Sequence, residues 1–242
     1  MTAPVLDAAK IVQTVARLRD RIAERFPQSG LASVAADLTH TARETAARVE
    51  HFNRPSIALR VLAGIAVVAG VAAQIYVARL VDWSAVIRRA DVVGLTQGLD
   101  SIVNLLLLAF AAIWFVLTLE QRLKRRRILH RLFELRSFAH VIDMHQLTKD
   151  PTIILAGGGS ATPSSPQRPM TEFELSRYLD YCAEMLALIA KLAALYAGRT
   201  PDGAVITAVN EVEELTSDLG RKIWQKIMIL GRLDERASVP SH

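Results

Sequence analysis

Two stretches of the chain carry apolar residues on every face of a helix and not only along one stripe. Residues 61–78 read VLAGIAVVAGVAAQIYVA and residues 101–119 read SIVNLLLLAFAAIWFVLTL, and neither stretch contains a charged residue. An apolar helix needs about 20 residues to cross the roughly 30 Å hydrocarbon layer of a bilayer. We therefore predict two membrane spans, over about 57–78 and 101–119, joined by an outer loop over 79–100. The alternative is a pair of buried helices in a soluble bundle, and it is disfavoured because both stretches are apolar on every face rather than along a stripe.

Basic residues predict how this hairpin is oriented. Five cations follow the second span directly: Arg122, Lys124, Arg125, Arg126 and Arg127. Basic residues beside a span remain on the cytoplasmic side, so both termini are predicted inside the cell. The same run suits contact with anionic lipid. A basic run also neutralises phosphates in nucleic-acid binding proteins, but its position against a span favours topology and lipid, and no nucleic-acid partner is predicted.

The residues before the first span show the three-four spacing of amphipathic helices. One stripe consists of Ala8, Ile11, Val15, Leu18 and Ile22, and a second consists of Leu31, Val34, Leu38, Thr45, Val49 and Phe52. The sequence PQSG at 27–30 separates them with turn-forming residues. We predict a cytoplasmic N-terminal helix hairpin over 1–54, followed by the transmembrane hairpin over 55–119.

No glycine or proline lies between Gly98 and Pro151, so the second span is predicted to continue as one helix from about Ser101 to Leu147. Its juxtamembrane part, 120–150, has a stripe of its own: Ile128, Leu132, Leu135, Ala139 and Ile142. At 1.5 Å per residue this helix would be on the order of 70 Å long. It would connect the membrane directly to the rest of the protein.

The remaining third of the chain predicts a linker and a second hairpin. Residues 151–170 are rich in Gly, Ser and Pro, which is typical of a flexible linker. A C-terminal helix hairpin is predicted over 171–232, followed by a disordered tail over 233–242. Its first helix has a capping box at Thr171 and Glu174 and a stripe of Leu175, Tyr178, Cys182, Met185, Ile189, Leu192 and Tyr196. In its second helix, Thr200 is predicted to cap, Pro201 to open the helix, and the stripe consists of Val205, Val209, Val212, Leu219, Ile223 and Leu230. The fold class is therefore an all-α membrane protein, with a transmembrane hairpin and a cytoplasmic helical bundle built from the two helix hairpins.

Composition agrees with this division. Apolar residues make up 51% of the chain and the mean hydropathy is +0.25, yet 22% of residues are charged, so much of the chain must face water. The single cysteine, Cys182, excludes an intramolecular disulfide framework and fits a reducing compartment. Its place on an apolar stripe predicts a small buried thiol. We predict a multi-pass protein of a bacterial inner membrane.

Candidate chemistry is sparse. His140 and Asp143 lie about 60° apart on a helix, whereas His145 lies about 200° from Asp143, so a metal ion there would need ligands from elsewhere, such as Asp180 or Glu184. The structural alternative is a polar helix end that packs against the C-terminal hairpin. The sequence contains no nucleophile elbow, Walker motif or zinc-ligand spacing. It therefore predicts neither an enzyme nor a cofactor.

Polar and small residues inside the spans suggest helix association. Gln74 and Asn104 are predicted at similar depth, where amides usually hydrogen-bond a neighbouring helix. Small residues four apart let helices approach closely, and the first span has two such pairs, Ala66 with Gly70 and Ala69 with Ala73. These residues would pack within the hairpin or between subunits of a homo-oligomer, in which the two amides could also line a pore.

Three functions remain open on these observations. The preferred one is an oligomeric inner-membrane scaffold or sensor that presents its cytoplasmic bundle to a protein partner. A gated channel or membrane-perturbing effector is the first alternative. In layout, a two-span hairpin with flanking helices, the chain resembles the SLATT-type effectors of bacterial conflict systems, and this resemblance implies that alternative. A membrane-tethered metal-dependent enzyme at His140 and Asp143 is the second alternative.

Overall fold

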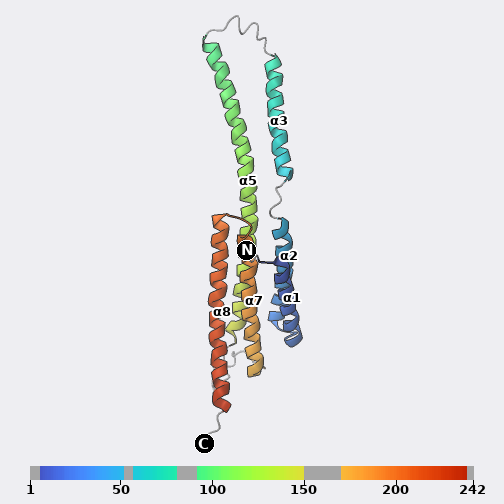
Figure 1. The fold of residues 1–242 in the computed structure, drawn as a ribbon, viewed down its shortest axis with the longest axis vertical. Helices are drawn as coiled ribbons and strands as arrows, with labels where there is room; N and C mark the ends of the chain where they lie inside the picture. Colours follow the sequence, from blue (N-terminus) through green and yellow to red (C-terminus); the bar gives the residue numbers. More distant parts are fainter. Residues whose placement is uncertain (1–5, 52–56, 81–91, 150–169, 239–242) are drawn as a thin grey trace, which may run out of the picture. The chain divides into compact units, whose positions relative to one another are not determined.

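The protein is helical throughout the part that the structure describes. The computed structural model describes residues 6–51, 57–80, 92–149 and 170–238. The helices are α1 (Ala8–Arg25), α2 (Gly30–His51), α3 (Ile57–Leu80), α5 (Val92–Leu147), α7 (Glu172–Ala197) and α8 (Gly203–Ser238) (Figure 1). The chain divides into two compact units, one made of residues 1–53 and 127–242 and the other of residues 54–126. Helix α5 contributes residues to both.

The first unit is a helical bundle with α7 as its central helix. Helix α7 packs against α8, α1 and α2 (Figure 1). Both sides of α7 are apolar, so residues outside its predicted stripe, such as Leu179, Leu186 and Leu195, are buried as well. A helix that is apolar on most of its surface belongs in the middle of a bundle. The central position of α7 was not predicted.

The predicted stripes form one continuous core. Buried members of these stripes include Ile11, Val15, Leu18 and Ile22 of α1, Leu31, Val34, Leu38 and Val49 of α2, Ile128, Leu132, Leu135, Ala139 and Ile142 of α5, and Val205, Val209, Val212, Leu219, Ile223 and Leu230 of α8. Three-four spacing places such residues on one face of a helix, and burial of that face stabilises the bundle. The prediction of a helical bundle is confirmed.

Capping side chains set two of the helix starts. The Thr171 hydroxyl accepts a hydrogen bond from the Glu174 amide at 3.2 Å, and the Glu174 carboxylate accepts one from the Thr171 amide at 2.8 Å, which confirms the capping box. The hydrogen bonds that the amide and the hydroxyl of Thr171 donate to the Glu174 carboxylate lower the pKa of Glu174. The predicted cap of α8 was wrong. Asp202 caps this helix, accepting from the amides of Ala204 and Val205 at 3.0 and 3.3 Å, because a carboxylate so placed satisfies two amides and complements the helix dipole.

Other boundaries differ from the prediction. Helix α5 has 56 residues and begins at Val92, inside the predicted outer loop, since a glycine such as Gly98 costs a helix only about 1 kcal/mol. Helix α8 continues to Ser238, so most of the predicted disordered tail is helical. The sequence contains no proline between Pro201 and Pro240 to end α8 earlier. The predicted linker, apart from Met170, lies outside the described residues.

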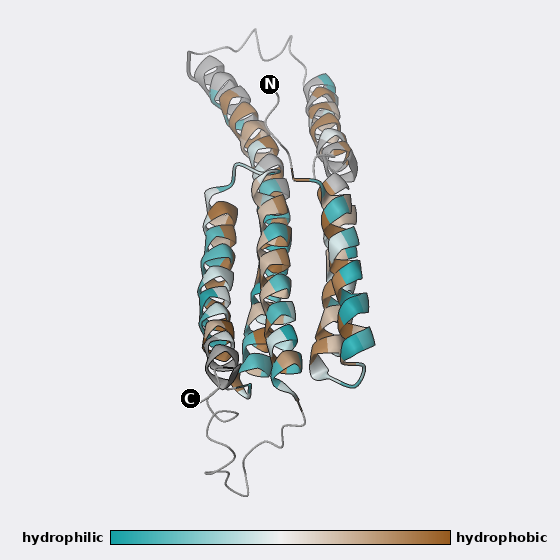
Figure 2. Cartoon of the chain, turned by 60° about the horizontal axis from the view of Figure 1, so that its bottom comes forward, coloured by the Kyte–Doolittle hydropathy of each residue, from teal (hydrophilic) through white to brown (hydrophobic). Residues whose placement is uncertain are grey.

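The second unit contains the apolar helices. Figure 2 shows hydrophobic residues around the described faces of α3 and of the first half of α5, whereas the bundle helices also carry hydrophilic residues. Among the described residues, one helical segment is long and apolar enough to cross a membrane, Leu106–Leu147 of α5, and none of its most apolar window, with a mean hydropathy of 1.6, is buried. The described apolar stretch of α3, Gly64–Ala73, is shorter than a span.

Candidate functional site

The apolar first half of α5 is the most distinctive surface of the chain. Large side chains are exposed on every side of it: Val103, Leu106, Leu107, Leu108, Phe110, Ile113, Trp114 and Phe115. A core helix of a soluble protein would be mostly buried, and a signal sequence would lie near the N-terminus. This segment is neither, and soluble proteins rarely expose so large an apolar surface. It therefore requires a covering, either lipid or another protein.

A shallow depression follows one side of this segment, within the second unit. It measures about 550 Å³ and is lined by Phe110, Ala111, Trp114, Phe115, Thr118, Leu119 and Arg122. The rings of Phe110 and Trp114 stack with centroids 6.3 Å apart. The Thr118 hydroxyl donates to the carbonyls of Trp114 and Phe115, both at 2.9 Å, so its polar hydrogen is satisfied within the helix. The walls are thus apolar, and Arg122 is the one charged group among the lining residues.

The predicted basic run directly follows the apolar segment along α5. Arg122, Arg125, Arg126 and Arg127 are exposed, and Lys124 is half-buried. One turn further along α5, Arg131 belongs to the bundle, where it pairs with Glu134 at 2.6 Å and with Glu44 of α2 at 3.2 Å. The hydrogen bond that Arg131 donates to Glu134 raises the pKa of the Arg131 guanidinium. Arg131 is therefore held by two carboxylates of the bundle.

The predicted residues for helix association lie on open surface where their side chains are described. Asn104 of α5 is exposed, and so are Ala66, Ala69, Gly70 and Ala73 of α3. A Cβ atom added at Gly70 would meet no other described atom within 4 Å. The side chain of Gln74 lies outside the described residues. The roles of these residues in association stay predictions.

The polar end of α5 is part of the bundle packing. Asp143 accepts a hydrogen bond from the Gln146 side-chain amide at 2.6 Å, while His140 is exposed. Gln146 is only 2% exposed, and both its side-chain and backbone oxygens accept from Lys226 of α8, at 2.6 and 3.0 Å. A buried amide of this kind needs partners, and Lys226 supplies one. Gln146 was missed in the sequence, although it occupies the next core position of the stripe after Ile142.

No third metal ligand joins His140 and Asp143 in the described part of the chain. No group of three or more His, Cys, Asp or Glu side chains there is placed to hold an ion. The two carboxylates considered as additional ligands have other partners, since Asp180 pairs with Arg177 at 3.1 Å and Glu184 pairs with Arg21. The metal site stays a prediction from sequence without a geometric counterpart.

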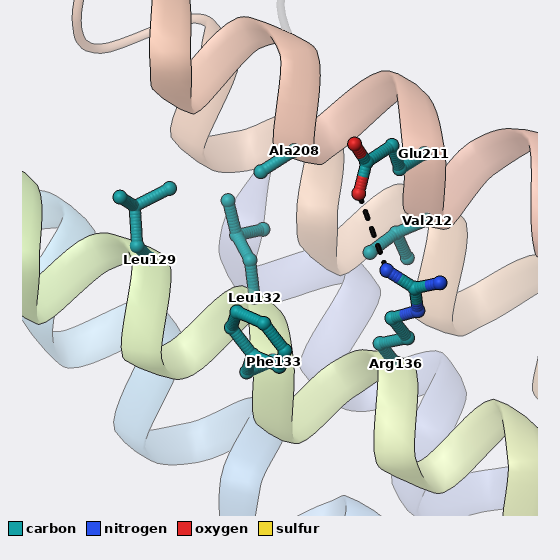
Figure 3. A pocket seen from close by; sticks show the side chains of 7 residues that line it. All are labelled: Leu129, Leu132, Phe133, Arg136, Ala208, Glu211 and Val212. Atoms are coloured by element: carbon teal, nitrogen blue, oxygen red, sulfur yellow. Dashed lines mark hydrogen bonds and ion pairs between the residues drawn. The ribbon is translucent and has the colours of Figure 1, made fainter.

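Two further depressions belong to the bundle. The first lies between α5 and α8, where Leu129, Leu132, Phe133, Ala208 and Val212 meet beside an ion pair of Arg136 with Glu211 at 3.2 Å (Figure 3). Its volume of about 30 Å³ suits a water molecule, far below the several hundred Å³ of a ligand site. It is a small gap in the packing between α5 and α8.

The second depression, between α1 and α7, carries side chains of both charges. It measures about 360 Å³ and is lined by Arg21, Glu24, Arg25, Arg177 and Tyr181. The guanidinium groups of Arg21 and Arg177 lie 5.6 and 5.8 Å from the centroid of the Tyr181 ring, and each also has a carboxylate partner. Because Arg21 and Arg177 have carboxylate partners and Glu24 adds a further negative charge, this surface has little excess charge to attract an anion.

Cys182 is buried in the bundle core, as predicted. Burial raises the pKa of its thiol to about 12, so almost none of the nucleophilic thiolate forms near neutral pH. The candidate functional surface is therefore the exposed apolar part of α5 with its terminal cations. No protein-family model, curated protein or solved structure matches this chain.

Proposed function

We propose that this chain is a membrane-anchored, self-associating scaffold or sensor that presents its helical bundle to partner proteins. One observation carries the proposal: α5 runs without a break from an exposed apolar segment to buried core residues of the bundle, from Leu132 to Ile142. A single helix thus supplies both the membrane segment and part of the bundle core. A shift of this helix caused by lipid or by another subunit would act directly on the bundle.

In this proposal α3 and the first part of α5 form a two-span hairpin, with spans over about 57–78 and 101–119. The basic run after the second span keeps both termini in the cytoplasm of a bacterial inner membrane. The support is the length of α3, 24 residues, and the exposure of its described apolar residues. Without lipid around them these residues would expose a large apolar area to water.

Topology is tested by cysteine labelling, because Cys182 is the only native thiol. In a Cys182→Ala background, Ser84→Cys marks the proposed outer loop and Gln13→Cys marks an exposed position of α1. A membrane-impermeant maleimide added to intact spheroplasts should label the cysteine at 84, and should label the one at 13 only after permeabilisation. The reverse pattern, or equal labelling of both before permeabilisation, would refute the proposed topology.

Self-association is tested by mass photometry in mild detergent, where we expect an oligomer. Gly70→Leu should shift the population toward monomer, since the small-residue face of α3 permits close helix approach. Gly64→Leu is the matched control. Gly64 lies on the same helix, about 170° around from the centre of that face, and a Cβ atom there also meets no described atom. A monomer in the wild type, or equal effects of the two substitutions, would contradict self-association through this face.

A membrane effector or channel remains the rival function. The observation that favours it is Asn104, an exposed amide on the apolar part of α5, since pores place polar side chains toward their axis. Ion flux through reconstituted liposomes should then be lost on Asn104→Leu or Gln74→Leu. Liposomes that stay impermeable with the wild-type protein would count against the channel and leave the scaffold in place.

A further inference from the structure

We propose that the depression along α5 is a binding site for one anionic phospholipid of the cytoplasmic leaflet, with an acyl chain along Phe110, Trp114 and Phe115 and the phosphate at Arg122. The inference rests on the proposed function, because it requires α5 to lie in a bilayer. It adds a named partner to that function: a lipid with a net negative headgroup.

The dimensions of the depression fit one leaflet. Its lining residues follow two rows with a spacing of four, Phe110 to Arg122 and Ala111 to Leu119, so they form a continuous strip on one side of α5. Twelve residues at about 1.5 Å per residue give a strip about 18 Å long. Half of a roughly 30 Å hydrocarbon layer is about 15 Å. With Arg122 at the headgroup level, the strip reaches close to the middle of the bilayer.

The walls of the depression suit a hydrocarbon chain. Phe110, Trp114 and Phe115 are 66%, 62% and 63% exposed, so their rings stand away from the helix on either side of the smaller Ala111. The Thr118 hydroxyl donates to backbone carbonyls, so its hydrogen does not need water as an acceptor. An acyl chain between the rings would cover apolar surface with no unsatisfied polar group among these residues.

The charge of the depression suits an anionic headgroup. Among the described residues no carboxylate pairs with Arg122, in contrast to Arg131, which has two carboxylate partners. A guanidinium group binds phosphate oxygens with two parallel hydrogen bonds. Arg126, one turn further, lies about 40° around the helix from Arg122 and adds positive charge on the same side. A phosphatidylglycerol headgroup keeps its negative charge uncompensated, whereas phosphatidylcholine carries its own cation, so the site should prefer the former.

The test uses Trp114 as the reporter. The chain contains three tryptophans, and the variant Trp83→Phe, Trp224→Phe leaves only Trp114. The full-length variant is reconstituted into phosphatidylcholine vesicles that contain increasing fractions of lipid brominated in mid-chain, either phosphatidylglycerol or phosphatidylcholine. Bromine quenches tryptophan on contact, so the two quenching curves compare occupancy by the two lipids. We expect about fivefold stronger association of the brominated phosphatidylglycerol, the preference that one cation near an anionic lipid supplies.

Matched variants separate the site from the general charge of the basic run. Arg122→Gln should remove the preference. Arg127→Gln removes the same charge about 140° around the helix and should leave the preference in place. Ala111→Leu keeps every charge but fills the apolar part of the depression, and should lower quenching by phosphatidylglycerol toward the phosphatidylcholine level. Equal effects of the two arginine substitutions would overturn the assignment to this depression.

The remaining outcomes distinguish this inference from the proposed function. Equal quenching by both lipids means that only non-selective lipid surrounds α5, and overturns the inference. Absence of quenching by either lipid, with the protein still floating with the vesicles, means that protein covers the depression, and also overturns it while leaving membrane anchoring intact. Protein that does not float with vesicles removes the proposed function itself.

Discussion

Gly30, the first residue of α2, packs against His145 near the end of α5, and replacing it with alanine should loosen that contact. A Cβ atom at Gly30 would lie 3.1 Å from Nε2 and 3.3 Å from Nδ1 of His145, and closer still to Cε1, so the imidazole must move. Overpacking costs about 1–3 kcal/mol, and the lower part of this range, about 1–2 kcal/mol, applies here because the imidazole is the end of a half-buried side chain that can turn aside. The better helix propensity of alanine returns up to about 1 kcal/mol. We therefore expect Gly30→Ala to destabilise the bundle by up to about 2 kcal/mol.

In a His145→Ala background the same substitution should become neutral or stabilising, because the ring is gone. The difference between the two backgrounds is a coupling free energy of about 1–2 kcal/mol, the cost of moving the ring. Gly203→Ala is the matched control: Gly203 is also the first residue of its helix, but a Cβ atom there meets no described atom within 4 Å. Its effect should be the same in both backgrounds.

The assay uses the native thiol of Cys182. This side chain is fully buried, so a thiol reagent reaches it only when the bundle opens. When opening and closing are fast relative to labelling, the labelling rate follows the opening equilibrium. A destabilisation of about 2 kcal/mol should then speed labelling about 30-fold. The same change in rate for Gly30→Ala with and without the imidazole of His145 would refute the contact between α2 and α5.

Three further results follow from the bundle. Leu135→Ala should destabilise the bundle by about 2–5 kcal/mol, because Leu135 is fully buried. Phe133→Ala, at a position that is 67% exposed, should change the unfolding free energy by less than about 1 kcal/mol. Equal effects of the two substitutions would contradict the placement of α5. Asp202→Ala should lower the free energy of unfolding by about 1 kcal/mol, and Thr200→Ala should lower it by less, because Asp202 caps α8. Thermal unfolding in detergent measures both effects, and a larger effect of Thr200→Ala would mean that Thr200 is the cap. Burial raises the pKa of Cys182 from 9.0 to about 12, so its contribution to stability is complete below pH 9 and is lost as the pH rises from 9 to 12. Denaturant unfolding at pH 8 and 10 should show a larger loss of stability for the wild type than for Cys182→Ala, and identical losses would contradict the raised pKa.

The sequence predicts the bundle well because its helices carry a regular apolar stripe. Residues such as Leu18 and Ile142 repeat at three-four spacing, and these positions are buried. The central position of α7 is harder to predict, because the sequence pattern of a helix that is apolar on two sides does not identify the helices that pack against it. The cap of α8 was misplaced because Thr200, Pro201 and Asp202 all favour a helix start, and only the backbone geometry decides among them.

The candidate site is predictable in composition but not in geometry. The apolar window and the basic run are visible in the sequence, and the structure adds that Arg122 shares one side of α5 with Trp114. The polar end of α5 shows the opposite case. His140 and Asp143 are of residue types that often bind metals, yet the polar side chain that the bundle buries there is Gln146. Gln146 is distinguished by its position in the stripe and by the hydrogen bond that it accepts from Lys226.

The central place of α7 has a consequence for how the protein is made. The ribosome completes α5 at Leu147 and completes α7 about 50 residues later, at Ala197. At about 5–20 residues per second, the apolar faces of α1, α2 and α5 wait for about 3–10 s before the helix that joins them emerges. The apolar segment of α5 leaves the ribosome before that interval, so in the proposed membrane anchor its insertion can precede closure of the bundle. Until α7 emerges, the bundle of the nascent chain lacks its central helix, and a chaperone that binds exposed apolar helices would find it in that state.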